Sequence, residues 1–155
     1  MTVKERLSEL GLTLPVAATP LAAYVPAVKA GEFVYVSGQV PLVEGRLKYK
    51  GTVGADLDLE TAREAARVCA LNCLAAAATV IDLEGVVRLV KLTGFVASTP
   101  DFHDHPKVVN GASELLQEIF GQAGLHARAA VGVSALPLGA PVEVELIIQV
   151  RPDRF

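Results

Sequence analysis

Arg128 is the residue of this sequence whose neighbours define its chemistry most sharply. It stands at the start of a run from Ala127 to Leu136 whose other members are mostly Ala, Val and Gly. A guanidinium is always charged and is costly to bury alone, so it needs a carboxylate partner or an anionic ligand. Two hypotheses follow: a structural ion pair at the end of a strand, or bidentate capture of a ligand carboxylate.

Glu143 and Glu145 are a second pair of residues that can do chemistry. They lie two residues apart, so in a strand they share the face opposite the neighbouring valines. Such a face is usually solvated, but if it lines a cleft, one carboxylate can orient or activate a water molecule. The short loop from Pro137 to Pro141 predicts that the strands carrying Arg128 and Glu143 are antiparallel neighbours. Arg128 then approaches Glu143 only if the pairing is staggered.

The three histidines, His103, His105 and His126, raise the question of a metal site. His103 and His105 alternate in a loop just before Pro106, and no Cys or third ligand stands at a spacing typical of zinc sites. We therefore expect no metal. The sequence also has neither a glycine loop for phosphate nor the turn that carries a serine nucleophile.

The composition bounds the organisation of the chain. Its 155 residues predict a single domain over residues 1–155, with residues 1–14 as an N-terminal helical extension. Hydrophobic residues make up 52% of the sequence and charged residues only 20%, below the usual ~25%. Because this apolar excess has to be covered, we expect a homo-oligomer.

Charge and aromatic content argue against a nucleic-acid partner. The net charge is -3, no basic run is present, aromatic residues make up 5%, and Trp is absent.

Uncharged residues fill the stretch from Leu10 to Val28, but Pro15, Pro20 and Pro26 interrupt it as a membrane span. Ser8 and Glu9 also break the apolar segment of a signal peptide. We expect no membrane partner and a cytoplasmic protein.

Hydrophobic periodicity predicts the elements that must position these residues. The order β-β-α-β-α-β-β, after a short N-terminal helix, is typical of an α+β fold with two helices on one face of a mixed sheet. The predicted segments are a helix over 2–10, strands over 24–29 and 33–37, a polar loop over 43–58, a helix from 59 to Gly85, a strand over 86–98, a helix starting near Pro106, and strands over 129–136 and 142–150.

The first long helix is the clearest element. Asp58 is its predicted N-cap. Cys69 and Cys73 lie on its apolar stripe, where we interpret them as small core residues.

Three ordered motifs resemble one family. They are YVSGQVPL from Tyr35 to Leu42, Val109-Asn110-Gly111, and ARAAVGVSALPLGAPVEVE from Ala127 to Glu145. In these motifs the sequence resembles the Rid (reactive intermediate deaminase, YjgF-like) family, and the resemblance runs from about Tyr24 to Val150.

The resemblance implies a chorismate mutase-like α+β fold and a homotrimer with its sites in clefts between subunits. It also implies hydrolysis of reactive 2-imino or enamine acids to 2-oxo acids and ammonia, without a cofactor. Carried over residue by residue, Arg128 clamps the carboxylate of the small-molecule substrate and Glu143 positions the attacking water. Tyr24, Ser37 and Asn110 shape or line the cleft.

The sequence departs from the family pattern near this cleft. Ala129 and Ala130 stand where many members have Ser-Cys after the arginine, and Ala22-Ala23 replaces the usual Gly-Pro. The N-terminal helix is added and the 43–58 loop is longer. Two alternatives therefore stay open: a non-enzymatic carboxylate-binding or regulatory trimer, and an endoribonuclease, against which the acidic charge and scarce aromatic residues speak.

Overall fold

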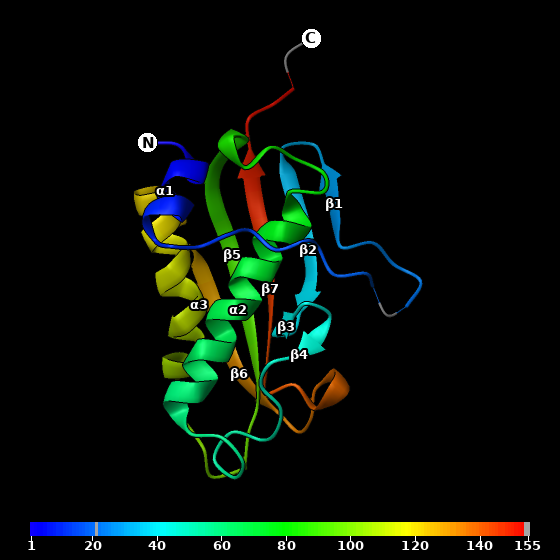
Figure 1. Cartoon of the computed structure of the whole chain (residues 1–155), viewed down its shortest axis with the longest axis vertical. Helices are drawn as coiled ribbons and strands as arrows, with labels where there is room; N and C mark the ends of the chain where they lie inside the picture. Colours follow the sequence, from blue (N-terminus) through cyan, green and yellow to red (C-terminus); the bar gives the residue numbers. More distant parts are fainter. Residues whose placement is uncertain (21, 154–155) are drawn as a thin grey trace.

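Two layers make up the molecule in the computed structural model, which describes residues 1–20 and 22–153. A five-stranded sheet forms one layer, and α2 and α3 lie side by side across one face of it (Figure 1). The elements are α1 (Val3–Glu9), β1 (Ala27–Ala30), β2 (Phe33–Gln39), β3 (Leu42–Val43), β4 (Arg46–Leu47), α2 (Leu59–Ala77), β5 (Val86–Ala97), α3 (His105–Phe120), β6 (Ala127–Val133) and β7 (Val142–Val150), with 3-10 turns η1 (Leu83–Gly85), η2 (Gly121–Gly124) and η3 (Pro137–Gly139).

The strand order is β1-β2-β7-β5-β6, in which β5 and β6 are parallel and the other pairs are antiparallel. The mixed α+β sandwich is therefore confirmed. The prediction that the Arg128 and Glu143 strands are neighbours is wrong, because β5 lies between β6 and β7. Residues 134–141 are long enough to cross one strand, and strands lie only ~4.8 Å apart.

β7 takes the central position because of its own side chains. Val142, Val144, Leu146, Ile148 and Val150 alternate along it and are all buried under the helices. A strand with such a row of buried side chains is stabilised most when it pairs with a strand on each side, here β2 and β5. The intervening residues, Glu143 among them, consequently point to the opposite, open face of the sheet.

α2 lies over β7 and begins as predicted. The Asp58 carboxylate accepts a hydrogen bond from the Thr61 amide at 2.8 Å. Cys69 and Cys73 are free and fully buried, and Cys73 donates to the Val144 carbonyl at 3.2 Å. The interpretation of both cysteines as small core residues is confirmed.

The end of α2 differs from the prediction. The helix ends at Ala77 rather than at Gly85. Thr79 donates its hydroxyl hydrogen back to the Ala76 carbonyl at 2.7 Å, and Asp82 caps the new turn η1. These local side-chain bonds compete with the helix and end it early.

Several strand boundaries also differ. β1 begins after Pro26 rather than at Tyr24, β2 continues to Gln39, and β6 runs from Ala127 to Val133. Most of a small hairpin, β3–β4, lies within the predicted 43–58 loop. Its turn is formed by Glu44 and Gly45, which both have positive φ angles.

The single domain over residues 1–155 stays a prediction, and Leu21, Arg154 and Phe155 lie outside the described residues. In the part of the chain that is described, no helix is both long enough and apolar enough to cross a membrane.

α3 comes unusually close to α2. A Cβ atom added at Gly111 would lie 2.1 Å from the Arg63 carbonyl oxygen, so only glycine fits there. Below it, Val109 packs onto Gly94 of β5, where an added Cβ would lie 2.5 Å from a Val109 methyl group. These two contacts fix the height and rotation of α3, and with them the position of Asn110.

Candidate functional site

Arg128 lies on the edge strand β6 and turns toward α3. Its Nη1 donates to Asn110 Oδ1 at 2.7 Å and to Ser113 Oγ at 3.2 Å, and its Nη2 donates to the Pro106 carbonyl at 3.3 Å. Pro106, Asn110 and Ser113 are spaced by four and three residues, so they lie on one face of α3. All three acceptors are neutral, and no ion pair among the described residues involves Arg128. The structural ion pair weighed from the sequence is therefore not what holds this side chain.

The contacts of Arg128 leave part of its guanidinium available. An arginine has five N–H bonds, and Asn110, Ser113 and Pro106 accept from its Nη1 and Nη2. Among residues 1–20 and 22–153, the Nε–H has no acceptor. At least two of the five N–H bonds, the Nε–H among them, therefore stay available for the oxygens of a carboxylate. Partial burial lowers the pKa of Arg128 from its usual range, but the group stays charged.

Glu143 lies in a different place, at a cavity of about 290 Å³ that Tyr24, Gly38 and Pro137 also line. Gly38 makes room for it, since a Cβ there would lie 2.9 Å from the Glu143 carboxyl carbon. The register of β2 against β7 shifts between Val36 and Gln39, which places Gly38 over the carboxylate. Gly38 stands in the YVSGQVPL motif, but sequence reasoning did not single it out.

The carboxyl group of Glu143 has a raised pKa. Burial is the main cause, and the negative charge of Glu145 on the same strand face adds to it. A carboxylate with a raised pKa is a better proton acceptor for a bound water than an ordinary surface glutamate. The arrangement therefore suits general-base chemistry.

Ser37 does not line this cavity. Its hydroxyl donates to the Val25 carbonyl at 2.7 Å, and the Ser37 amide donates to the Pro26 carbonyl at 2.9 Å. Ser37 thus fastens the segment that carries Tyr24 to the start of β2. Its role in shaping or lining the substrate cleft stays a prediction.

Within one chain, the predicted site residues form two separate groups. Arg128 and Asn110 meet on the α3 side of the outer strand β6, whereas Tyr24 and Glu143 meet at the other face of the sheet, beyond β5. One chain by itself therefore does not bring the Arg128 guanidinium to the Glu143 carboxylate.

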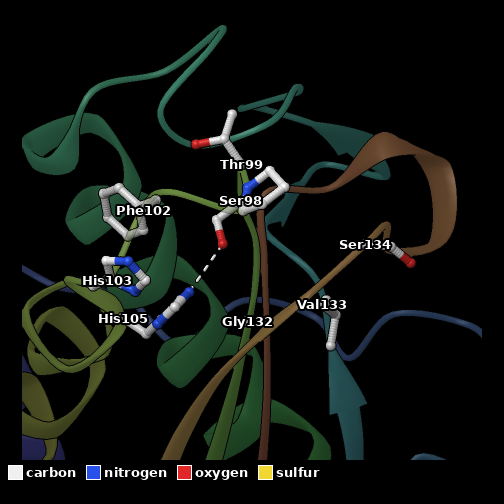
Figure 2. Close-up of a pocket in the computed structure, with 9 residues that line it drawn as sticks. Ser98, Thr99, Phe102, His103, His105, Gly132, Val133 and Ser134 are labelled. Carbon is white, nitrogen blue, oxygen red and sulfur yellow. Dashed lines mark hydrogen bonds between the residues drawn. The ribbon is translucent and has the colours of Figure 1, made fainter.

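A further pocket of about 350 Å³ lies between the end of β6 and the start of α3 (Figure 2). His105 Nε2 and Ser98 Oγ are 2.9 Å apart in it, and the Phe102 ring meets the imidazole edge-on. Gly132 leaves room for the ring, because a Cβ there would lie 2.5 Å from His105 Nε2. Sequence reasoning missed this pair.

The Ser98–His105 pair lacks a part that nucleophilic catalysis uses. In such sites a third group accepts from the other ring nitrogen and orients the imidazole. No hydrogen bond of His105 Nδ1 is present in the described chain. The pair therefore joins the end of β5 to the start of α3. In the same described residues, no three His, Cys, Asp or Glu side chains gather closely enough to hold a metal ion.

Comparisons with known proteins agree on one family. A family model described as "YjgF/chorismate mutase-like, putative endoribonuclease" matches residues 4–150. Protein TCP17 of Trypanosoma cruzi is 42% identical over 151 residues, which cover 96% of this chain and 94% of that protein. The 2-iminobutanoate/2-iminopropanoate deaminase of Dermatophagoides farinae is 29% identical over 143 residues, covering 90% and 95%. The crystal structure of Atu1372 from Agrobacterium tumefaciens, a protein of unknown function, is 45% identical with a TM-score of 0.88, covering 97% of this chain and 94% of that one.

Proposed function

Because the chain belongs to the YjgF/chorismate mutase-like family, we propose that it hydrolyses reactive 2-imino or enamine acids to 2-oxo acids and ammonia. The observation that carries the proposal is the charged guanidinium of Arg128, which three neutral acceptors on α3 hold in place without neutralising it, and whose Nε–H has no acceptor among the described residues. A charged group held in this way suits a small carboxylate. The 29% identical relative from Dermatophagoides farinae, which is named for this reaction, supports the choice of substrate class.

The chemistry needs few groups. Arg128 binds the carboxylate and so fixes the position of the neighbouring imine carbon. Glu143 accepts a proton from water as the water oxygen attacks that carbon. Glu143 then returns this proton to the amino group of the resulting amino alcohol. Ammonia leaves as the carbonyl of the 2-oxo acid forms, and the hydroxyl proton passes to the departing ammonia. The protonated imine is already electrophilic, so no cofactor takes part in these steps.

The site becomes complete when two chains meet. One chain supplies Arg128 and Asn110, and its neighbour supplies Tyr24 and Glu143, in a homotrimer. The open face of the sheet supports such an assembly, because Phe33, Tyr35 and Val131 are 37%, 49% and 44% exposed on it. Apolar side chains gathered on one face are typical of a surface that another subunit covers.

The direct test is turnover of 2-iminobutanoate generated in situ by an amino-acid oxidase with catalase present. We expect the full-length oligomer to release 2-oxobutanoate faster than spontaneous hydrolysis, in proportion to its concentration. A rate equal to the spontaneous one over a wide range of protein concentration would reject the deaminase proposal.

Removing the guanidinium is expected to weaken substrate capture. Each charge-assisted hydrogen bond contributes roughly 1.5–3 kcal/mol, so Arg128→Ala should lower kcat/KM by on the order of 10- to 150-fold. The fall should appear mainly in KM, since the carboxylate is bound alike before and during reaction. Steady-state kinetics measure it.

Arg67→Ala is the matched control. Arg67 lies on α2 and makes only a partly exposed ion pair with Glu118, at 3.6 Å, so the variant should keep its kcat/KM. Wild-type kinetics in Arg128→Ala would contradict the assignment.

Carboxylate binding without turnover is a second candidate function. Ala129 and Ala130 follow the arginine where the family resemblance leads us to expect Ser-Cys, and both methyl side chains lack a polar group for substrate. Saturable calorimetric binding of 2-oxobutanoate, together with a spontaneous hydrolysis rate, would favour this function over the deaminase.

A further inference from the structure

Two side chains behind Arg128 form a continuous hydrogen-bonded chain with it. Arg128 Nη1 lies 3.2 Å from Ser113 Oγ, Ser113 Oγ lies 2.9 Å from His126 Nε2, and His126 Nδ1 lies 2.7 Å from the Gly124 carbonyl. Ser113 is only 6% exposed and His126 is partly buried. The chain thus connects the guanidinium to the backbone of η2.

The direction of every bond in this chain follows from chemistry. The Gly124 carbonyl only accepts, so His126 carries its hydrogen on Nδ1. The guanidinium only donates, so Ser113 Oγ accepts from Arg128. The Ser113 hydroxyl hydrogen is then left for His126 Nε2, which accepts it when the imidazole is neutral. One protonation pattern satisfies all four groups at once.

We infer that Ser113 and His126 are positioning residues, which hold the Arg128 guanidinium so that its available N–H bonds face the substrate carboxylate. The inference rests on the proposed function of Arg128. Asn110 and Pro106 contact the same guanidinium, but among the described residues Ser113 is the acceptor that connects it to a further side chain, His126. Without that connection, rotation about the long side chain would spread the guanidinium over several orientations, and a fixed orientation is what a bidentate contact needs.

The arrangement makes carboxylate binding depend on the charge of His126. A protonated imidazole donates from both nitrogens, so Ser113 Oγ would face two donors and its own hydrogen would lose its acceptor. Two cations would then share one oxygen. Burial is the main cause that lowers the pKa of His126; the hydrogen bond to the Gly124 carbonyl opposes it, and the charge of Arg128 adds a smaller lowering. The lowered pKa keeps His126 neutral near pH 7.

Among the described residues, His126 makes no ion pair with a carboxylate. β6 contributes Arg128, and η2 contributes the Gly124 carbonyl. On β5, Arg88 donates to the Leu125 carbonyl at 3.2 Å, and Lys91 is opposite Ala127 in the sheet. On α3, Glu114 is paired with Arg63. The charge that acts on His126 is that of Arg128, and it opposes protonation.

The test measures the Kd of 2-oxobutanoate by calorimetry and the kinetics with 2-iminobutanoate, on full-length wild type and on three variants. His126→Leu removes the acceptor, and His126→Gln keeps an acceptor that does not titrate. His103→Leu makes the same change at an exposed histidine outside the chain of bonds. Thermal unfolding and oligomeric state are recorded for each.

We expect His126→Leu to raise Kd and KM roughly 5- to 10-fold, the size of one weakened hydrogen bond to a charged group, while kcat changes little. His126→Gln should restore most of the affinity. Because the pKa of His126 is lowered, its protonation belongs below the ordinary histidine range; acidification from about pH 7 to about pH 4.5 should raise the wild-type Kd, and this rise should be much smaller in His126→Gln. The ligand stays ionised over this range, and Glu143, which also titrates, is common to both proteins.

Unchanged Kd and KM in His126→Leu, or an acid response in His126→Gln equal to that of wild type, would overturn the positioning role even if the protein is a deaminase. The predicted pattern in Kd without any turnover would support the positioning role and reject the deaminase. A wild type that does not bind 2-oxobutanoate at all would reject both.

Discussion

Replacing Glu143 with glutamine is expected to lower kcat for 2-iminobutanoate roughly 10²- to 10⁴-fold, the range that general-base catalysis contributes. Glutamine fills the same space beside Gly38, where a Cβ would lie 2.9 Å from the Glu143 carboxyl carbon, but it cannot accept a proton from water. KM should change much less, because Arg128 supplies the carboxylate contact. Steady-state kinetics on Glu143→Gln measure both constants.

The pH profile gives this prediction a second readout. Burial and the neighbouring Glu145 charge raise the pKa of Glu143, and the reaction needs the ionised form. As pH falls through this raised pKa, Glu143 takes up a proton and kcat falls. The acid limb should therefore lie above the pH range in which an ordinary glutamate titrates.

Glu145→Gln is the matched control on the same strand face. It removes one negative charge and leaves Glu143 in place, so the plateau of kcat should be kept. Since the repulsion is gone, the pKa of Glu143 falls and the acid limb should move to lower pH. A Glu143→Gln variant within two- or three-fold of the wild-type kcat would show that another group activates the water.

The layered fold was predictable because its core follows simple periods. The alternating row from Val142 to Val150 predicts a strand buried on one face, and the structure buries each of those five residues. The stripe through Cys69 and Cys73 predicts a helix packed on a sheet, and both thiols lie against β7. The motif resemblance and the chorismate mutase-like fold are likewise confirmed by the family match over residues 4–150.

Strand neighbours were not predictable in the same way. The loop after β6 is short, which favours a hairpin, but β7 pairs with β2 and β5 instead. A short loop favours pairing of β6 with β7, but the burial of the side chains from Val142 to Val150 favours a central position for β7, and the burial has the larger effect. Such pairing depends on contacts between segments that are distant in the sequence, and hydrophobic periodicity carries no information about these contacts.

The site shows the same division. The residue type and apolar surroundings of Arg128 predict a charged group that needs an anionic partner or ligand, and the carboxylate-binding role of Arg128 stays a prediction. The resemblance implied only that Asn110 shapes or lines the cleft, and the structure places Asn110 2.7 Å from Arg128. The contributions of Ser113 and His126 were not predicted, although Asn110 and Ser113 stand three apart and face the same way on α3. The separation of Arg128 from Glu143 follows from the strand order, so it could not be predicted from the sequence before that order was known.

Gly111→Val is expected to have the largest effect on stability. A Cβ at this position would lie 2.1 Å from the Arg63 carbonyl oxygen, and that oxygen belongs to helix backbone, which cannot swing aside. Valine would push α2 and α3 apart and open the core between them, which costs ~3 kcal/mol or more. Native domains are stable by only ~5–15 kcal/mol, so the urea midpoint should fall sharply.

Local propensity predicts the opposite sign for this substitution. Glycine inside a helix is less favourable than other residues, and on that ground alone a side chain at Gly111 should stabilise α3 by a few tenths of a kcal/mol up to ~1 kcal/mol. The backbone contact is expected to outweigh this gain because it involves two rigid helices. Gly85→Val is the matched control, since nothing lies within 4 Å of a Cβ there, and it should change stability by only about 0.5 kcal/mol. Urea unfolding of the two variants decides between the effects: a Gly111→Val protein as stable as wild type would mean that the helices can separate freely, and the position assigned to Asn110 and Arg128 would lose its support.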